Sequence, residues 1–180
     1  MLGNPLTSHT EERLFPELHG FVLADPGLLD DFHDHQARHR DLLDLYTTSN
    51  VGEVVAAEGV AIPVIGLEPG YYAVTIRTES GPSPLSQPPL DRSTGWLLRV
   101  SSGEVAVAGV GYLKNWDPRH PKVRRFPLER GWYSVDILVG TAMNGDDFAL
   151  DFVLRACAAR PQFSADLAWT PNMNTATPTR

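Results

Sequence analysis

Residues 67–76 read Leu-Glu-Pro-Gly-Tyr-Tyr-Ala-Val-Thr-Ile, and residues 128–137 read Leu-Glu-Arg-Gly-Trp-Tyr-Ser-Val-Asp-Ile. The two stretches share the pattern Leu-Glu-x-Gly-aromatic-Tyr-x-Val-x-Ile, with six identities and one aromatic exchange in ten positions. A glycine followed by alternating aromatic and β-branched residues is typical of a turn that leads into a β-strand. The recurrence indicates an internal duplication.

The period-two alternation predicts which side chains face the core of these strands. Tyr72, Val74 and Ile76 are expected inside, like Tyr133, Val135 and Ile137, while Thr75 and Asp136 are expected outside. A further strand is predicted over 148–157, with Asp151 and Arg155 on its outer side.

The repeat extends toward the N-terminus through a shorter match, Gly-Glu-Val at 52–54 and again at 103–105. An apolar stretch precedes each match, over 42–48 and 96–101, and we interpret both as strands. The copies then cover about 42–78 and 96–140. The prediction is a mostly β fold, an antiparallel β-sandwich of about 8–9 strands, with a closed β-barrel as the alternative.

Outside the repeat we expect one peripheral N-terminal helix over about 26–40, because Asp25-Pro26 is a helix-start signal and apolar residues follow at helical spacing. Four prolines make the segment 81–90 a surface loop. Residues 1–160 are predicted to form a single domain, and residues 161–180, rich in Pro, Thr and Asn, a loosely held tail.

The composition is that of an ordinary globular chain of 180 residues, with 42% hydrophobic and 21% charged residues. No apolar run approaches the roughly 18 residues of a membrane span, and the N-terminus lacks a signal-peptide pattern. Cys157 is the only cysteine, so no internal disulfide is expected. These features predict a cytoplasmic protein.

The net charge of −7 is unevenly distributed. Residues 1–60 hold eleven acidic and three basic residues, a net charge of −8, whereas residues 61–180 carry +1. Such asymmetry indicates an interaction face or a solubilising surface. The acidic candidates lie in and around the predicted helix: Asp25, Asp30, Asp31, Asp34, Asp41 and Asp44.

The second copy of the repeat contains an insertion of ten residues around 113–122. Together with the two arginines that follow, this stretch holds five of the fifteen Lys and Arg residues. Trp combined with Arg in a long loop is the composition of an interaction hot spot. The partner-binding candidates here are Trp116, Arg119, His120, Lys122, Arg124 and Arg125. The alternative is a long hairpin tip whose Trp folds back onto the sandwich and whose cations stay solvated.

A histidine cluster accompanies the acidic residues, because His35 and His39 lie four residues apart and His33 is nearby. One face of a helix could hold a metal between them, but the spacing matches no specific metal motif. We therefore expect no metal and no cofactor. No nucleophile elbow or phosphate-binding glycine loop occurs in the sequence, which favours a protein that is not an enzyme.

The leading hypothesis is a protein-binding module, specifically a bacterial inhibitor or immunity protein that neutralises a toxin or nuclease through an acidic face. Nucleic acid is disfavoured as a partner by the negative charge, and no membrane association is expected. The alternatives are a β-sandwich that binds a small ligand or carbohydrate on Trp96, Trp116 or Trp132, and a metal-dependent enzyme built around His35 and His39.

Overall fold

A computed structural model describes residues 7–174 of the chain. The nine described strands form two sheets, and neither of them closes into a barrel. The large sheet has the order β1-β4-β9-β8-β5 and the small sheet the order β3-β2-β6-β7. The strands are β1 (Ser8–Leu14), β2 (Gly20–Ala24), β3 (Ala61–Ile65), β4 (Tyr72–Thr78), β5 (Asp91–Val100), β6 (Glu104–Gly109), β7 (Arg124–Pro127), β8 (Gly131–Thr141) and β9 (Phe148–Cys157). The mostly β prediction is therefore confirmed, and the closed barrel is wrong.

The inner faces of the two sheets contribute to one hydrophobic core. Phe21, Ile62 and Phe126 from the small sheet lie in the same cluster as Tyr72 and Ile137 from the large sheet. The predicted inward residues of β4 and β8 are buried as expected. That the two sheets form a β-sandwich stays a prediction. One strand pair departs from the antiparallel prediction, because β4 runs parallel to β9.

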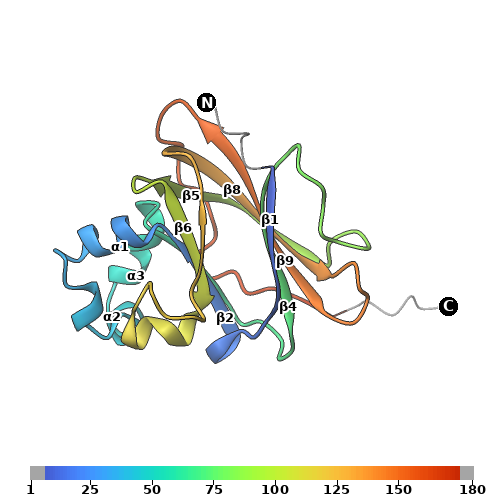
Figure 1. The fold of residues 1–180 in the computed structure, drawn as a ribbon, viewed down its shortest axis with the longest axis horizontal. Coiled ribbons are helices and arrows are strands. Elements are labelled where there is room, and N and C mark those ends of the chain that lie inside the picture. The colour runs from blue at the N-terminus through green and yellow to red at the C-terminus, as the bar shows by residue number, and fades with distance from the viewer. Residues whose placement is uncertain (1–6, 175–180) are drawn as a thin grey trace.

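Helices form a third layer on the outer face of the small sheet. Figure 1 shows α1 (Pro26–Phe32), α2 (Leu42–Thr48) and α3 (Val51–Ala57) gathered on one side of the molecule, beside β6 and β2. Leu29, Leu42 and Val55 of these helices pack against the outward side chains of Val22 and Ala106. A 3₁₀ helix, η3 (Val110–Asn115), adjoins this layer.

The strand predicted over 42–48 is wrong, because these residues form α2. Asp41 caps the helix by accepting a hydrogen bond from the Asp44 backbone N–H at 2.9 Å. The Gly-Glu-Val at 52–54 then lies inside α3, whereas in its match at 103–105 only Gly103 precedes β6 and the other two residues begin that strand. The similarity of these two tripeptides is therefore not structural.

The helix predicted over 26–40 is shorter, ending at Phe32. Asp34 and His35 adopt positive φ values of 52° and 61°, which an α-helix does not allow. The Asp30 carboxylate accepts a hydrogen bond from the Ala37 N–H at 3.3 Å and contacts the His35 ring. A single 3₁₀ turn, η2 (Ala37–His39), follows.

The two copies of the ten-residue repeat share the same local backbone geometry and hydrogen bond. Gly70 and Gly131 both have a φ of +150°, a conformation reserved for glycine. The Tyr72 hydroxyl donates to the Glu68 carbonyl at 3.0 Å, and the Tyr133 hydroxyl donates to the Glu129 carbonyl at 2.6 Å. The two strands lie on either side of β9 in the large sheet. Duplication of the whole unit stays a prediction.

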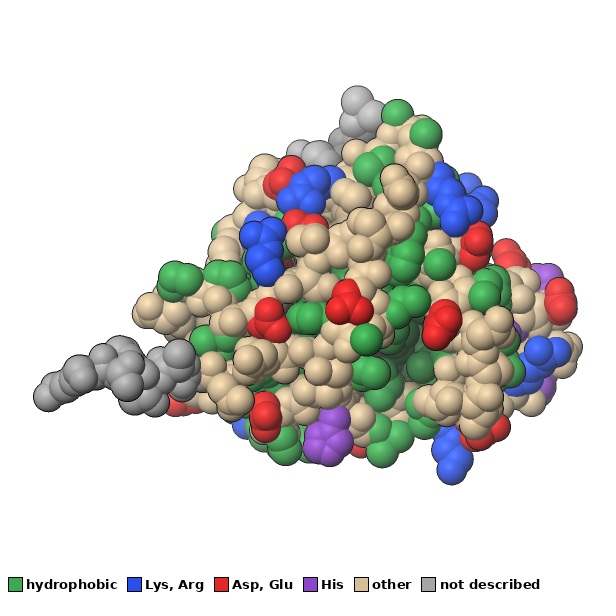
Figure 2. All heavy atoms as spheres, turned by 180° about the vertical axis from the view of Figure 1, so that it is seen from behind, with side chains coloured by type: hydrophobic (Ala, Val, Ile, Leu, Met, Phe, Trp, Pro, Cys, Tyr) green, Lys and Arg blue, Asp and Glu red, His purple; other side chains and the backbone are tan. Residues whose placement is uncertain are grey.

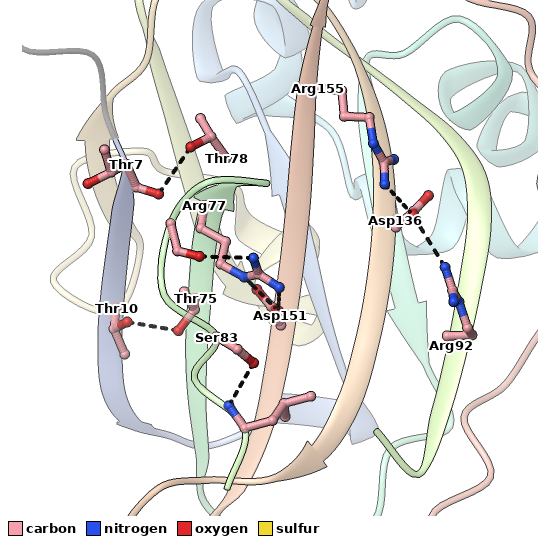
Figure 3. A network of polar contacts seen from close by, with 12 residues as sticks. Thr7, Thr10, Thr75, Arg77, Thr78, Ser83, Arg92, Asp136, Asp151 and Arg155 are labelled. Carbon is pink, nitrogen blue, oxygen red and sulfur yellow. Dashed lines mark hydrogen bonds and ion pairs between the residues drawn. The ribbon is translucent and has the colours of Figure 1, made fainter. Parts of the chain in front are cut away.

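The outer face of the large sheet is polar and partly covered, so three of the four residues predicted on it, Thr75, Asp136 and Asp151, are buried. Thr75 is 1% exposed and Asp151 is fully buried. Figure 3 shows Asp151 paired with Arg77, whose guanidinium also donates to the Gly81 carbonyl at 3.2 Å. The proline-rich segment 81–90 forms no strand and covers part of this face. Asp136 lies between Arg155 and Arg92 in the same view.

The described part of the C-terminal segment, residues 161–174, lies against the core. Phe163 and Trp169 pack on the main cluster, and Met173 is buried within it. The Trp169 indole N–H donates to Asp91 at 3.2 Å. Residues 175–180 lie outside the described residues, and the loosely held tail stays a prediction.

Candidate binding surfaces

A groove of about 650 Å³ follows strand β7, all four residues of which line it. Residues 118–121 of the insertion, the turn at 102–104 and Glu11 of β1 also line it. We call this depression the arginine groove, because its predicted site residues are Arg119, His120, Arg124 and Arg125.

The guanidinium groups in the arginine groove are only loosely paired. Arg124 lies 4.0 Å from Glu11 and Arg125 lies 3.6 Å from Glu104, and the two arginine side chains are 43% and 45% exposed. Arg119 has no ion pair among the residues that the structure describes. These cations are therefore free to bind an anionic group from outside.

Trp116 lies beneath the surface rather than in the groove. Its side chain is 2% exposed and packs in the cluster between the small sheet and the helices. Trp116 is thus an anchor that holds the insertion against the helical layer, as the folded-back alternative predicts. Asp117 strengthens this attachment through an ion pair with Arg38 at 3.5 Å.

A second depression, of about 170 Å³, adjoins the first and shares Arg124 with it. Lys122, the remaining cation predicted from the insertion, lies here. Phe15 and Tyr71 stand edge to face, with ring centroids 6.1 Å apart, and are 50% and 46% exposed. We call this depression the aromatic hollow; it is lined by Arg13, Leu14, Phe15, Glu17, Phe21, Tyr71, Ala108, Gly109, Tyr112, Lys122 and Arg124.

The chain segment that borders the aromatic hollow is strained. Arg13, Leu18 and His19 all have φ values between 56° and 60°, a region unfavourable for residues other than glycine. The Arg13 guanidinium lies 4.4 Å from the centre of the Tyr71 ring. Strained backbone beside an exposed cation–aromatic pair is typical of a binding site.

The sequence did not point to Arg13, Phe15 or Tyr112. Arg13 lies in β1, Phe15 in the β1–β2 connection and Tyr112 in η3, and only the fold brings them beside the insertion. Tyr71 was visible as the variable aromatic of the repeat, where the other copy has Trp132. This variability, and the period-two alternation that places the neighbouring Tyr72 inside, both indicated that Tyr71 is not part of the core.

The acidic candidates lie in and around the helical layer, and none of them lines the arginine groove or the aromatic hollow. Residues 25–58 hold eight acidic and two basic residues, a net charge of −6 out of the −7 of the whole chain. Asp31, Asp34, Asp44 and Glu53 are exposed there. Figure 2 shows the helical layer at its right-hand edge, where Asp, Glu and His side chains reach the surface together with Lys or Arg side chains.

Three of the acidic residues have local structural roles instead. Asp25 is fully buried and accepts hydrogen bonds from the backbone N–H groups of Gly27, Ser101 and Ser102 at 2.7–2.8 Å. Asp30 holds the turn after α1, and Asp41 caps α2. The sequence pattern identified Asp25 as part of a helix-start signal, but it did not predict the contacts of Asp30 and Asp41.

The three histidines of the cluster do not converge. His33 is buried against Tyr46, with which it shares a hydrogen bond, and burial together with nearby Arg40 lowers the pKa of His33. His35 is exposed beside Asp30 and Asp31, and His39 lies one short turn further on. Within residues 7–174 no group of three potential metal ligands is assembled.

The tryptophans proposed to stack on a ligand are buried or already contacted by other side chains. Trp96 is 2% exposed and donates its indole N–H to Ser93 at 2.8 Å. The ring of Trp132 has the guanidinium groups of Arg99 and Arg160 at 5.6 Å and 5.5 Å from its centre. Trp96 and Trp116 are therefore unsuited to stack on a sugar, and arginines already contact Trp132.

Comparisons with known proteins do not assign the chain to a family. No family model and no curated protein sequence matches it. Among solved structures, ComJ from Bacillus subtilis, an inhibitor of the DNA-degrading activity of NucA, is 12% identical, with a TM-score of 0.48 over 84% of this chain and 100% of ComJ. The product of crocagin biosynthetic gene J is 10% identical, with a TM-score of 0.44 over 82% of this chain and 96% of its own. With TM-scores below 0.5, these likenesses assign no function to this chain.

No helix among residues 7–174 is both long and apolar enough to cross a membrane.

Proposed function

We propose that this chain is a non-enzymatic protein-binding module whose acidic helical layer docks on a basic surface of another protein. The observation that carries the proposal is the segregation of charge, because residues 25–58 hold a net charge of −6 and the remainder only −1. A surface with one sign of charge accelerates the encounter with a partner of opposite sign and fixes its orientation.

The helical layer is a preorganised surface. Asp25 ties the start of α1 to the turn at Ser101 and Ser102, and Leu29, Leu42 and Val55 pack against the small sheet. A surface that is already ordered loses little conformational entropy when a partner binds. Val54, which is 41% exposed next to Glu53, adds an apolar contact among the charges.

The specific role we propose is inhibition of a basic enzyme, as in an immunity protein or an inhibitor of a nuclease or toxin. Enzymes that act on nucleic acids bind phosphates through Lys and Arg side chains. A rigid acidic surface competes for those cations and blocks the substrate. The exposed residues that would make this contact are Asp31, Asp34, Asp44 and Glu53.

Affinity capture from the native host tests the proposal. The wild-type chain is compared with the triple variant Asp31→Asn/Asp34→Asn/Asp44→Asn, and captured proteins are quantified by mass spectrometry. We expect a basic protein that is eluted by salt and is captured about fivefold less by the variant, because rim charges each contribute modestly.

A matched control removes three exposed carboxylates outside the helical layer, in Glu12→Gln/Glu68→Gln/Asp146→Asn. This control has the same net charge as the test variant and should capture the partner as the wild type does. Equal loss with both triple variants would mean that total charge matters and the helical layer does not.

A further inference from the structure

We infer that the arginine groove and the aromatic hollow together bind an acidic, extended segment of a partner protein. This surface is distinct from the acidic helical layer and does not rest on the function proposed for that layer. The two depressions meet at Arg124, which lines both of them. They therefore form one continuous contact surface.

The charge of this surface is opposite to that of the chain. The two depressions are lined by five cationic side chains, Arg13, Arg119, Lys122, Arg124 and Arg125, and by three carboxylates, Glu11, Glu17 and Glu104. The resulting local charge of +2 stands on a molecule of net charge −7. Complementarity selects a partner segment with carboxylates.

The shape of the groove fits an extended chain. Strand β7 is the last strand of the small sheet, and no described strand pairs with its outer edge. Four residues of strand span about 13 Å. An extended peptide that lies along β7 meets Arg119, Arg124 and Arg125, which line the groove, and the strand edge with which no described strand pairs.

The aromatic hollow supplies the apolar part of the interface. Phe15 and Tyr71 present ring surface that is about half exposed, and Arg13 covers one face of the Tyr71 ring. Tyr, Phe and Arg are the residue types enriched in protein–protein contacts. The hollow therefore accepts an apolar or aromatic side chain next to the acidic part of the partner segment.

A polypeptide fits this surface better than a nucleic acid does. Nucleic acids bind through many phosphate contacts, and each carboxylate near a phosphate repels it. Glu11, Glu17 and Glu104 are spread through the two depressions, so a continuous polyanion meets repulsion in several places. A peptide can place its carboxylates opposite the arginines alone.

Selection from a random dodecapeptide library displayed on phage tests the inference with defined probes. The wild-type chain and the variant Arg119→Glu/Arg124→Glu are used in parallel. The control variant Arg40→Glu/Lys114→Glu carries the same charge change at two exposed positions outside both depressions. Thermal unfolding of each variant establishes that it is folded, and Arg124→Gln replaces the double variant if that one is not.

We expect the wild type to enrich peptides that combine at least two acidic residues with an aromatic residue. Synthetic forms of these peptides should bind at least about tenfold more weakly to Arg119→Glu/Arg124→Glu and about fivefold more weakly to Tyr71→Ala, and the control should bind them like the wild type. Variants of the acidic helical layer should also bind them normally, which separates this test from that of the proposed function.

Enrichment of peptides without acidic residues, or unchanged affinity in Arg119→Glu/Arg124→Glu, would overturn the inference. A twelve-nucleotide single-stranded DNA is measured as well. If it binds the wild type more tightly than every selected peptide does, and if Arg119→Glu/Arg124→Glu loses this binding, the surface is assigned to nucleic acid instead of a protein segment.

Discussion

Asp25 connects the helical layer to the turn between β5 and β6. Its carboxylate is fully buried and accepts hydrogen bonds from Gly27, Leu28, Ser101 and Ser102. Because hydrogen bonds to a buried charge are stronger than neutral ones, this single side chain fixes where α1 begins and how the acidic layer is oriented.

Substitution of Asp25 by Ala should therefore lower the free energy of unfolding by roughly 3 kcal/mol, since several backbone N–H groups lose their acceptor. Asp41→Ala, at an exposed N-cap with one hydrogen bond, should cost only about 1 kcal/mol. Urea denaturation measures both. Equal losses in the two variants would show that Asp25 is no more than an ordinary helix cap.

Asp151 makes the free energy of unfolding depend on pH. Burial raises its pKa to about 6, against the opposing effect of Arg77, which lies 2.9 Å away. The folded protein thus holds this proton more tightly than the unfolded chain does. The contribution of the group to stability is complete below the unfolded pKa near 4 and is lost as the pH rises through about 6.

The measurement is the free energy of unfolding of the wild type minus that of Asp151→Asn between about pH 4 and pH 7. We expect the difference to fall by roughly 1–3 kcal/mol as the pH rises, because Asn does not titrate. A difference that rises with pH would mean that pairing with Arg77 outweighs burial and lowers the pKa instead.

At the scale of elements, the Leu-Glu-x-Gly-aromatic-Tyr pattern specifies a turn and the strand after it. The glycine adopts a backbone conformation closed to other residues, and the tyrosine hydroxyl returns to the carbonyl four residues earlier. Both requirements are local, so the sequence alone was sufficient to place β4 and β8.

Tyr133→Phe tests this local geometry. Loss of the hydrogen bond to the Glu129 carbonyl should lower the free energy of unfolding by about 1 kcal/mol. Tyr112→Phe is the control, because its hydroxyl has no hydrogen-bond partner within the described residues. Chemical denaturation that finds no difference between the two variants would contradict a role for the hydroxyl in the turn.

The helices α2 and α3 were beyond the sequence patterns because β-branched and aromatic residues in short runs favour strands. Leu42 and Tyr46 lie four residues apart, as do Val51 and Val55, and both pairs pack against the helical-layer core. The spacing and the Asp41 cap were the helical signals present, but each helix has only seven residues, too few for a clear period.

At the scale of the molecule, the order of the strands and the composition of the candidate site depend on contacts between distant segments. The insertion in the second copy correctly drew attention to Arg119, His120, Arg124 and Arg125, which line one groove. Arg13, Phe15 and Tyr71 come from more than forty residues away in the sequence, and no local pattern joined them to the groove. The burial of Trp116 could not be predicted, because the composition of a segment does not show which of its side chains are buried.

Three side chains of the described residues 161–174 pack on or within the main core cluster. Deletion of residues 161–180 removes Phe163, Trp169 and Met173 from the core and should cost about 3 kcal/mol or more. Deletion of residues 175–180 removes none of these three side chains and serves as the control. Thermal unfolding that is unchanged by the longer deletion would support the loosely held tail predicted from composition.

Recognition of a basic partner by the acidic helical layer would make the association rate depend on salt. The rate of association with the captured partner is therefore measured at about 50 mM and about 300 mM NaCl, where screening differs strongly. We predict a rate that falls steeply with salt, and a rate for Asp31→Asn/Asp34→Asn/Asp44→Asn that is lower at low salt and converges with the wild type at high salt. An association rate that is the same for both proteins and independent of salt would contradict the claim.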